Sequence, residues 1–311
     1  MPEPPPPAVK FLDPLRTATG EPRAQVPLRR LDTLWFNTGT LCNVTCTHCY
    51  IESSPRNDRL AYLTAAEVAR FLDEIAREAL GTTTIGFTGG EPFMNRALRP
   101  MLEDVLGRGL SALVLTNAMQ PLHLARGWLP ELLRHGDRLT IRVSLDHHTA
   151  AVHEAERGAG TWASTVAGLR WLTEAGFAVH VAGRRFTDEP EAALRAGYGA
   201  LFSELGLAID AADPVALTIF PEMDATASVP EITEACWGIL GRSPDSVMCA
   251  SARMVVKRKG AARPAVLACT LLPYDPRFEL GASLRASFVP VALNHPYCAQ
   301  FCVLGGGACS R

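Results

Sequence analysis

Cysteines are the residues in this chain whose spacing most directly suggests chemistry. Three stand within eight residues of one another near the start, at Cys42, Cys46 and Cys49. Three more stand within twelve residues near the end, at Cys298, Cys302 and Cys309. In a reducing compartment, thiols grouped in this way indicate bound metal rather than disulfides. The sequence therefore predicts two metal centres.

The first group is spaced for an iron–sulfur cluster. Three thiolates leave a tetrahedral zinc one ligand short, and no fourth cysteine lies nearby in the sequence. A 4Fe–4S cluster held by three cysteines instead keeps one iron open for a further ligand. Zinc completed by His48 is the alternative, although a ring directly adjacent to Cys49 is poorly placed for it.

The second group suits a cluster that needs no external ligand, because four thiolates complete a 4Fe–4S centre. Cys269, Cys298, Cys302 and Cys309 form the simplest set. Gly305, Gly306 and Gly307 would let the backbone wrap around such a cluster. A zinc site is again the alternative. Cys236 and Cys249 then remain unassigned, and a leftover thiol is usually a buried apolar residue.

The elements that would position these cysteines follow a repeated β–α pattern from about residue 30 to 222. Strands are expected at 31–37, 84–87, 112–116, 139–144, 178–182 and 215–220. Helices are expected after a capping box at Thr64 and Glu67, and at 95–108, 121–134, 161–174 and 190–205. Six such repeats favour an α/β fold with a parallel sheet, either an incomplete barrel or a doubly wound sheet.

The two ends of the chain differ from this central part. Five prolines in the first seven residues predict an extended or disordered leader, which we place at residues 1–30. Residues 31–224 form the β–α unit, and 225–311 form a loop-rich region with one helix at 230–240 and a hairpin from 254–257 to 265–268. That region has little apolar periodicity, so we expect bound metal to hold it together.

Composition excludes several classes of partner. The 311 residues are 48% hydrophobic and carry a net charge of −2, so no basic face for nucleic acid or membrane is expected. No apolar run approaches the roughly 20 residues of a membrane-spanning helix. The proline-rich start is not a signal peptide. These features predict a cytoplasmic protein.

The Cys-x3-Cys-x2-Cys spacing after a first strand resembles the signature of the radical S-adenosylmethionine (SAM) superfamily. The resemblance extends over about residues 31–222 and implies an incomplete (β/α)6 barrel. In that family the open iron binds the amino and carboxylate groups of SAM. An external donor such as flavodoxin or ferredoxin supplies an electron, and the 5′-deoxyadenosyl radical that results abstracts a hydrogen atom from the substrate.

The resemblance also implies how this chain would bind SAM. Gly89, Gly90 and Glu91 end the second strand like the family's site for the SAM amino group, with Glu91 as the acceptor. Ser144, in Ser-Leu-Asp, is similar to the family's ribose contact. Asn117 ends the third strand and faces the same mouth of the barrel.

Two further positions fit less closely. Arg157 either pairs with the SAM carboxylate or lies on the surface. His48 stands where the family usually has another aromatic residue, and its flat ring is compatible with packing on adenine.

The C-terminal region resembles the auxiliary-cluster extensions called SPASM and Twitch, which implies a second 4Fe–4S cluster. It departs from that pattern because Cys269 follows Gly260 by nine residues instead of five. In a radical enzyme, a spare thiol can return a hydrogen atom to a carbon radical. Cys249 is better placed for this role than Cys236, and the alternatives are a cluster ligand or a core thiol.

Three reactions suit this machinery. A redox-neutral epimerase would use Cys249 as the hydrogen donor, whereas a dehydrogenase would pass an electron to the auxiliary cluster. A peptide-modifying enzyme usually has an N-terminal peptide-binding domain, for which residues 1–30 leave no room. A non-enzymatic iron–sulfur protein would leave Glu91 and Ser144 without a purpose.

Acidic residues in the loops at the barrel mouth favour a cationic substrate, unless they are simply solvated. They are Asp146, Asp188, Glu189, Glu191, Glu222 and Asp224, and Asp210 and Asp213 lie just before the sixth strand. With the short length and the spare cysteine, they make the chain similar to the aminoglycoside epimerases of antibiotic biosynthesis. An epimerase acting on a small aminoglycoside is therefore the main expectation.

Overall fold

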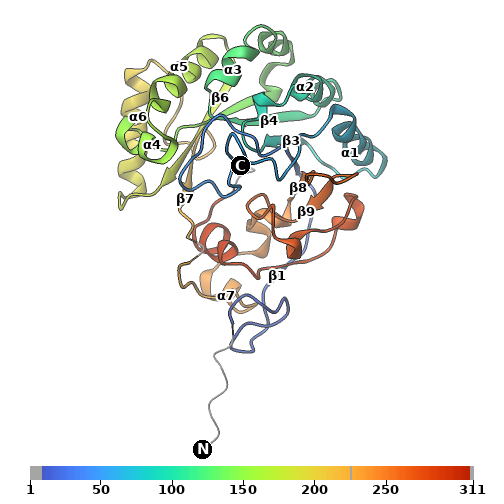
Figure 1. Cartoon of the computed structure of the whole chain (residues 1–311). Coiled ribbons are helices and arrows are strands. Elements are labelled where there is room, and N and C mark those ends of the chain that lie inside the picture. The colour runs from blue at the N-terminus through green and yellow to red at the C-terminus, as the bar shows by residue number, and fades with distance from the viewer. Residues whose placement is uncertain (1–8, 225, 309–311) are drawn as a thin grey trace, which may run out of the picture.

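One eight-stranded sheet organises the chain in the computed structural model, which describes residues 9–224 and 226–308 (Figure 1). Its strands, in spatial order, are β7 (Leu217–Pro221), β6 (Ala178–Arg185), β5 (Leu139–Ser144), β4 (Ser111–Thr116), β3 (Thr84–Thr88), β2 (Thr33–Asn37), β8 (Ala252–Val256) and β9 (Ala265–Leu267). The strands from β2 to β7 are parallel, β8 joins β2 in parallel, and β9 returns antiparallel. The carboxyl ends of six successive strands thus meet at one edge.

Helices line the outer side of this sheet in an arc (Figure 1). They are α1 (Ala65–Arg77), α2 (Leu98–Gly107), α3 (Gln120–Ala125), α4 (Ala150–Arg157), α5 (Thr161–Glu174) and α6 (Glu191–Glu204), while the short α7 (Cys236–Leu240) lies apart from them. Shorter helical turns are η1 (Pro92–Met94), η2 (Leu129–Arg138), η3 (Pro244–Ser246), η4 (Met248–Ala250), η5 (Pro276–Phe278), η6 (Arg285–Ser287) and the π-helical η7 (Cys298–Leu304). In the part of the chain that is described, no helix is long and apolar enough to cross a lipid bilayer.

Strand β2 shows how the sheet separates two apolar cores. Side chains alternate along a strand, so Leu34 and Phe36 pack under the helices, whereas Trp35 points to the opposite face. All three are fully buried. Because both faces are covered, the parallel strands are mostly apolar, and this composition makes them recognisable in the sequence.

The predicted α/β fold with a parallel sheet is confirmed. Each expected strand is present within a few residues, and the helix expected at 161–174 is α5. The capping box at the start of α1 is also present: Thr64 Oγ1 accepts from Glu67 N, and Glu67 Oε2 accepts from Thr64 N at 2.9 Å.

The helix expected at 121–134 is wrong in one respect, because the structure divides it into α3 and η2. Pro130 lies at the start of η2. Since proline has no backbone N–H, it cannot continue the hydrogen-bond ladder from α3, but it is well suited to a new first turn.

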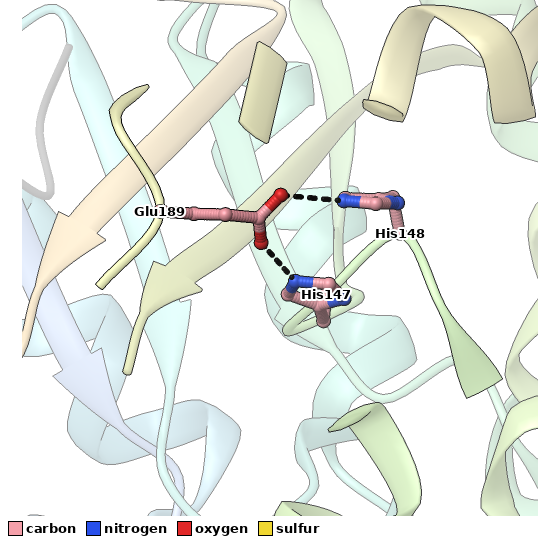
Figure 2. A group of neighbouring side chains, drawn as sticks. All are labelled: His147, His148 and Glu189. Carbon is pink, nitrogen blue, oxygen red and sulfur yellow. Dashed lines mark hydrogen bonds and ion pairs between the residues drawn. The ribbon is translucent and has the colours of Figure 1, made fainter. Parts of the chain in front are cut away.

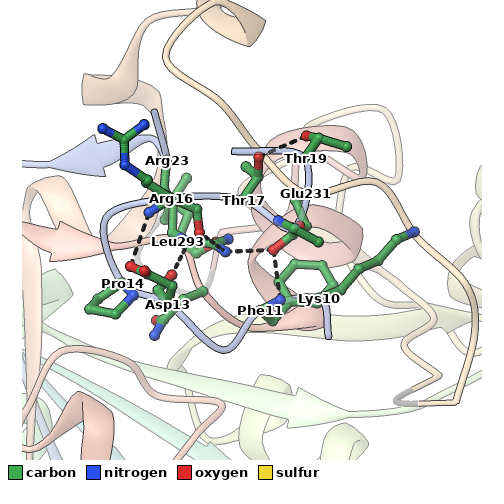
Figure 3. Close-up of polar contacts among 12 residues, drawn as sticks. Lys10, Phe11, Asp13, Pro14, Arg16, Thr17, Thr19, Arg23, Glu231 and Leu293 are labelled. Carbon is green, nitrogen blue, oxygen red and sulfur yellow. Dashed lines mark hydrogen bonds and ion pairs between the residues drawn. The ribbon is translucent and has the colours of Figure 1, made fainter. Parts of the chain in front are cut away.

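The helix expected at 230–240 is also too long, because only α7 is helical. Residues before α7 are extended, with Thr233 bridged to Arg23, and Glu231 binds the N-terminal segment. Its carboxylate accepts from Arg23 Nη2 at 2.5 Å and from the backbone N–H groups of Phe11 and Ala18, both at 2.6 Å (Figure 3).

Residues 9–30 therefore differ from the expected leader. Arg23 is 2% exposed, and β1 (Gln25–Val26) pairs with β10 (Val291–Ala292). The segment is anchored to the C-terminal region by these contacts, whereas residues 1–8 lie outside the described part of the chain. A proline-rich composition did not reveal this, since the anchoring partners lie more than 200 residues away.

The C-terminal region has an apolar core, contrary to the expectation that metal alone holds it together. Met254, Leu267, Phe278 and Phe301 are buried with Trp35 against the inner face of the sheet. This core is shared with the β–α unit, so short apolar stretches suffice, and no regular periodicity marks them in the sequence.

Candidate active site

A cavity of about 160 Å³ opens at the carboxyl ends of the strands. Every strand from β2 to β7 contributes to its walls, either directly or through the residue that follows it. The predicted residues that line it are Cys42, Cys46, His48, Cys49, Gly89, Gly90, Asn117, Ser144 and Arg157. The fold therefore brings together nine residues that are spread over more than 100 positions of the sequence. Of the residues predicted to bind SAM, to hold the first cluster or to react with the substrate, Glu91 and Cys249 are absent from this wall.

The three cysteines lie in the loop after β2, and the loop is fixed from several sides. Asn117 Nδ2 donates to Asn43 Oδ1 at 2.9 Å, and Ser53 N donates to Cys49 Sγ at 3.3 Å. Burial raises the pKa of the Cys42 thiol to about 12. Without a bound cation, a sulfur with that pKa keeps its proton at neutral pH.

The number of sulfurs decides between a cluster and a single ion. Three cysteines leave a tetrahedral zinc one ligand short, whereas they can hold three corners of a 4Fe–4S cluster.

The glycine turn after β3 is pressed against the cysteine loop. A Cβ at Gly90 would lie 2.1 Å from the carbonyl oxygen of Leu41, and a Cβ at Gly89 would lie 2.5 Å from that of Gly39. Gly89 also has a φ of +139°. Only glycine fits both positions. The turn can therefore present its backbone to a ligand in the cavity.

Glu91 follows this turn but is only 1% exposed. Its Oε1 accepts from Thr116 Oγ1 at 2.9 Å and from Phe93 N at 3.1 Å, and its Oε2 accepts from Asn117 N at 2.9 Å. Burial raises its pKa to about 7 in spite of these hydrogen bonds. In this structure Glu91 therefore fixes the end of β4, and with it Asn117, beneath the cavity wall.

The Ser-Leu-Asp segment provides an ion pair as well as the predicted serine. Arg157 Nε and Nη2 donate to the two oxygens of Asp146 at 2.6 and 2.9 Å. Both side chains line the cavity and are largely buried, so Arg157 is not a surface arginine. Burial raises the pKa of the Cys46 thiol, and the positive charge of Arg157 opposes this increase.

Sequence analysis missed a second charged network beside the cysteine loop. Glu156 accepts from His48 N at 2.8 Å, and its other oxygen lies 2.7 Å from His48 Nδ1. Arg184 Nη1 donates to Glu156 at 2.9 Å, while Arg184 Nη2 donates to both oxygens of Glu222. This network joins the loop to α4, β6 and β7. No sequence spacing connects these residues, because the contacts arise only when the strands come together.

His147, His148 and Glu189 form a further cluster near the ends of β5 and β6 (Figure 2). His147 Nε2 and Glu189 Oε2 are 3.0 Å apart, and the two imidazole rings stack at 4.2 Å. Thr149 N donates to His147 Nδ1 at 3.1 Å, which occupies the lone pair there. With Nδ1 assigned as the acceptor, the Nε2–H group donates a hydrogen bond to Glu189 Oε2. These contacts hold the loop after β6 against the end of β5.

The remaining cysteines gather at a second, small cavity in the C-terminal region. Its cysteines are Cys249, Cys269, Cys298 and Cys302, and most other residues in its wall are apolar. Cys309 lies outside the described residues. Cys236 lines neither cavity, and its sulfur accepts from Thr233 N at 3.4 Å. The structure thus groups Cys249 with three predicted cluster ligands and places it away from the large cavity.

Comparison with known proteins gives relatives with varied activities. The chain is 30% identical over 168 residues to the antilisterial bacteriocin subtilosin biosynthesis protein AlbA of Bacillus subtilis, covering 53% of this chain and 35% of that protein. It is 33% identical over 144 residues to the GTP 3′,8-cyclase of Rhodococcus opacus, covering 44% and 38%. The matches thus span little more than a third of each relative's length.

A solved structure shares the fold across a larger part of the chain. Streptococcus suis SuiB bound to the precursor peptide SuiA superposes with a TM-score of 0.56 and 12% identity, over 84% of this chain and 63% of that one. In addition, the sequence model of the radical SAM superfamily matches residues 36–196, which include the three-cysteine loop, the glycine turn and Arg157. This match covers more than half of the chain and most of the wall of the large cavity, and the chain belongs to the radical SAM superfamily.

Proposed function

We propose that this radical SAM enzyme oxidises a peptide, and that a second 4Fe–4S cluster accepts the electron that the substrate gives up. The observation that carries the proposal is the position of residues 269–271. Cys269 and Leu271 line the second cavity, while Thr270 and Leu271 line the large cavity. A substrate radical in the large cavity is therefore separated from the second group of cysteines by one short loop.

The residues around the large cavity fit the cofactors of the superfamily. We assign Cys42, Cys46 and Cys49 to the first 4Fe–4S cluster. The backbone at Gly89 and Gly90, together with Asn117, Ser144, Arg157 and His48, is assigned to SAM. Cluster and SAM together supply hydrogen-atom abstraction when they are bound. The chain's own contribution is to hold the loop rigid through Asn117 and Glu156 and to set a buried positive charge, Arg157, beside it.

The second cavity fits a second cluster. Cysteines from η4, from η7 and from the loop after β9 line a small space whose other walls are mostly apolar, which leaves the thiols as its main ligands. We propose Cys249, Cys269, Cys298 and Cys302 as ligands, with Cys309 as the alternative to one of them. A flavodoxin-like or ferredoxin-like protein is the proposed electron donor of the first cluster.

The expected role of Cys249 as a hydrogen donor loses its support. A donor must reach the substrate radical, but Cys249 is absent from the described wall of the large cavity. An epimerase would then need another donor, and among the described residues no other cysteine outside the three-cysteine loop lines that cavity. Oxidation of the substrate radical needs no hydrogen-atom donor, so the geometry favours oxidation over redox-neutral epimerisation.

The expected cationic substrate also loses support, because three of the acidic residues of the mouth are paired with arginines of the protein. Asp146 pairs with Arg157, Glu222 with Arg184, and Glu191 with Arg195 at 2.8 Å. Paired carboxylates offer little net attraction to an aminoglycoside. Comparison favours a peptide instead, since one relative takes part in bacteriocin biosynthesis and SuiB binds a precursor peptide.

We further propose that residues 31–224 form an incomplete six-unit (β/α) barrel and that 225–311 form the auxiliary unit. The two units share the sheet, because β8 extends it beyond β2. This arrangement brings the auxiliary cysteines to the inner side of the barrel. The close contact would let the auxiliary unit close one side of the substrate cavity.

The test uses anaerobically reconstituted enzyme with SAM, a reductant and a library of short synthetic peptides, in deuterated water. We expect 5′-deoxyadenosine and a peptide that has lost two hydrogen atoms. Incorporation of one deuterium without loss of hydrogen atoms would instead indicate epimerisation. The variant with alanine at Cys42, Cys46 and Cys49 serves as the control and should form neither product.

A further inference from the structure

Arg253 is a cation buried in the middle of the C-terminal region. It lies in β8 and is only 1% exposed. Its Nη1 donates to the carbonyl oxygens of Cys249 at 2.6 Å and Ala252 at 2.9 Å. Its Nε and Nη2 donate to the carbonyl oxygen of Ser287 at 3.1 and 3.0 Å. Nη2 also donates to the carbonyl oxygen of Val289 at 3.4 Å. The guanidinium thus holds η4 and η6 against β8.

These contacts satisfy the N–H groups of Arg253 but leave its charge uncompensated. All of its hydrogen bonds within the described residues go to main-chain carbonyls, and no described carboxylate pairs with it. Burial lowers the pKa of Arg253 to about 10, so the side chain remains charged at neutral pH. An isolated buried charge is costly unless an anion lies nearby.

The second cavity offers that anion. Cys249, whose carbonyl accepts from Arg253, turns its side chain to the cavity shared with Cys269, Cys298 and Cys302. A cubane held by four thiolates carries net negative charge, and reduction adds one more. Arg253 would face this charge across a region closed to water.

We propose that Arg253 raises the reduction potential of the second cluster by stabilising its reduced, more negative form. The inference rests on the proposed function, in which that cluster is the electron acceptor. The substrate radical gives up one electron and releases one proton to water. The cluster is reduced by that electron, which then passes to an oxidised one-electron carrier protein. Net charge, hydrogen bonds and solvent exposure set such potentials, and a buried cation acts strongly at low effective dielectric.

The experiment isolates the second cluster in the full-length chain by replacing Cys42, Cys46 and Cys49 with alanine. Arg253→Met, Arg253→Gln and Arg253→Lys are added to this background. A redox titration followed by electron paramagnetic resonance then measures the potential, and iron content is measured in parallel. Arg258→Met is the matched control, because Arg258 lies just beyond the same strand but is half-exposed and paired with Glu279.

We expect both neutral variants to keep their iron and to shift the reduction equilibrium about tenfold toward the oxidised form, which is about 59 mV for one electron. Arg253→Lys should shift less, and Arg258→Met should not shift. Unchanged potentials at full iron content would overturn the proposal. If the neutral variants lose the cluster while Arg253→Lys keeps it, the charge is required and the proposal stands.

Two further outcomes would reject either the proposal for Arg253 or the proposed function. Loss of iron in all three variants, Arg253→Lys included, would make Arg253 a structural clamp for the carbonyls and overturn the proposal. If the background with three alanines contains no iron at all, the second cluster itself is absent. That result would reject the proposed function independently of Arg253, so the two failures are distinguishable.

Discussion

Asp146 and Arg157 meet beside the cysteine loop through two short hydrogen bonds with little access to solvent. Asp146→Asn would remove the negative charge and leave the guanidinium buried without compensation. We expect the free energy of unfolding to fall by about 3 kcal/mol, as for other buried pairs that lose one partner. Urea denaturation measures this change.

Asp188→Asn is the matched control for that variant, because Asp188 is exposed in the loop after β6. Its effect should stay within about 0.5 kcal/mol. Equal denaturation midpoints for the two variants would mean that Arg157 finds another partner or leaves the cavity wall.

Glu91 predicts a dependence of stability on pH. In the folded protein its pKa is about 7, against an ordinary value of 4.5. Between these two values the folded state retains a proton that the unfolded state has released, so stability must fall as pH rises. Between pH 4.5 and pH 7, the free energy of unfolding of the wild type should therefore fall by up to roughly 3 kcal/mol relative to that of Glu91→Gln. Denaturation of both proteins without SAM, across that range, measures the difference. A constant difference would show that Glu91 is ionised throughout.

At the scale of elements, the sequence predicted most of the sheet and its helices. Buried parallel strands leave continuous apolar runs, and α5 was found at its observed ends. The cysteine loop, the glycine turn and Ser144 were also predictable, because each follows a strand directly. Local signals of this kind survive without knowledge of the tertiary structure.

Contacts between distant elements were not predictable. Glu156 joins His48 to Arg184 only because α4 and β6 meet beside the loop. Glu231 reaches Arg23 across 208 residues, and that contact replaces the expected first turns of a helix. The sequence did not group Cys249 with Cys269, Cys298 and Cys302, because the number of thiols cannot show which of them share a cavity.

The start of α1 provides a prediction at this scale. Thr64 and Glu67 cap the helix reciprocally, and Glu67 Oε1 also accepts from Lys257 Nζ at 2.6 Å, just beyond β8. Thr64→Ala should lower the free energy of unfolding by about 1 kcal/mol, because one N-terminal N–H group loses its acceptor. Ser203→Ala, on an exposed turn of α6, is the control and should change little. Chemical denaturation at constant iron content separates the two. No difference between them would indicate that water replaces the cap.

For the whole molecule, the proposed function places one cluster at each of two cavities that are separated by one short loop. Metal content tests this directly, with about eight irons expected per chain in wild type and about four after replacement of the three loop cysteines by alanine. Zinc in stoichiometric amount after native purification would contradict the second cluster.

The grouping of cysteines also predicts the iron content of single-cysteine variants. Cys249 shares a cavity with Cys269, Cys298 and Cys302, whereas Cys236 lines neither cavity. Cys249→Ala should therefore reduce the iron content to about four, while Cys236→Ala, an equal change in side-chain size, should leave about eight. Retention of iron in Cys249→Ala, together with its loss in Cys309→Ala, would assign the fourth ligand to Cys309. Cys249 would then be a thiol beside the cluster, and a radical trapped in that variant would return it to the role of hydrogen donor.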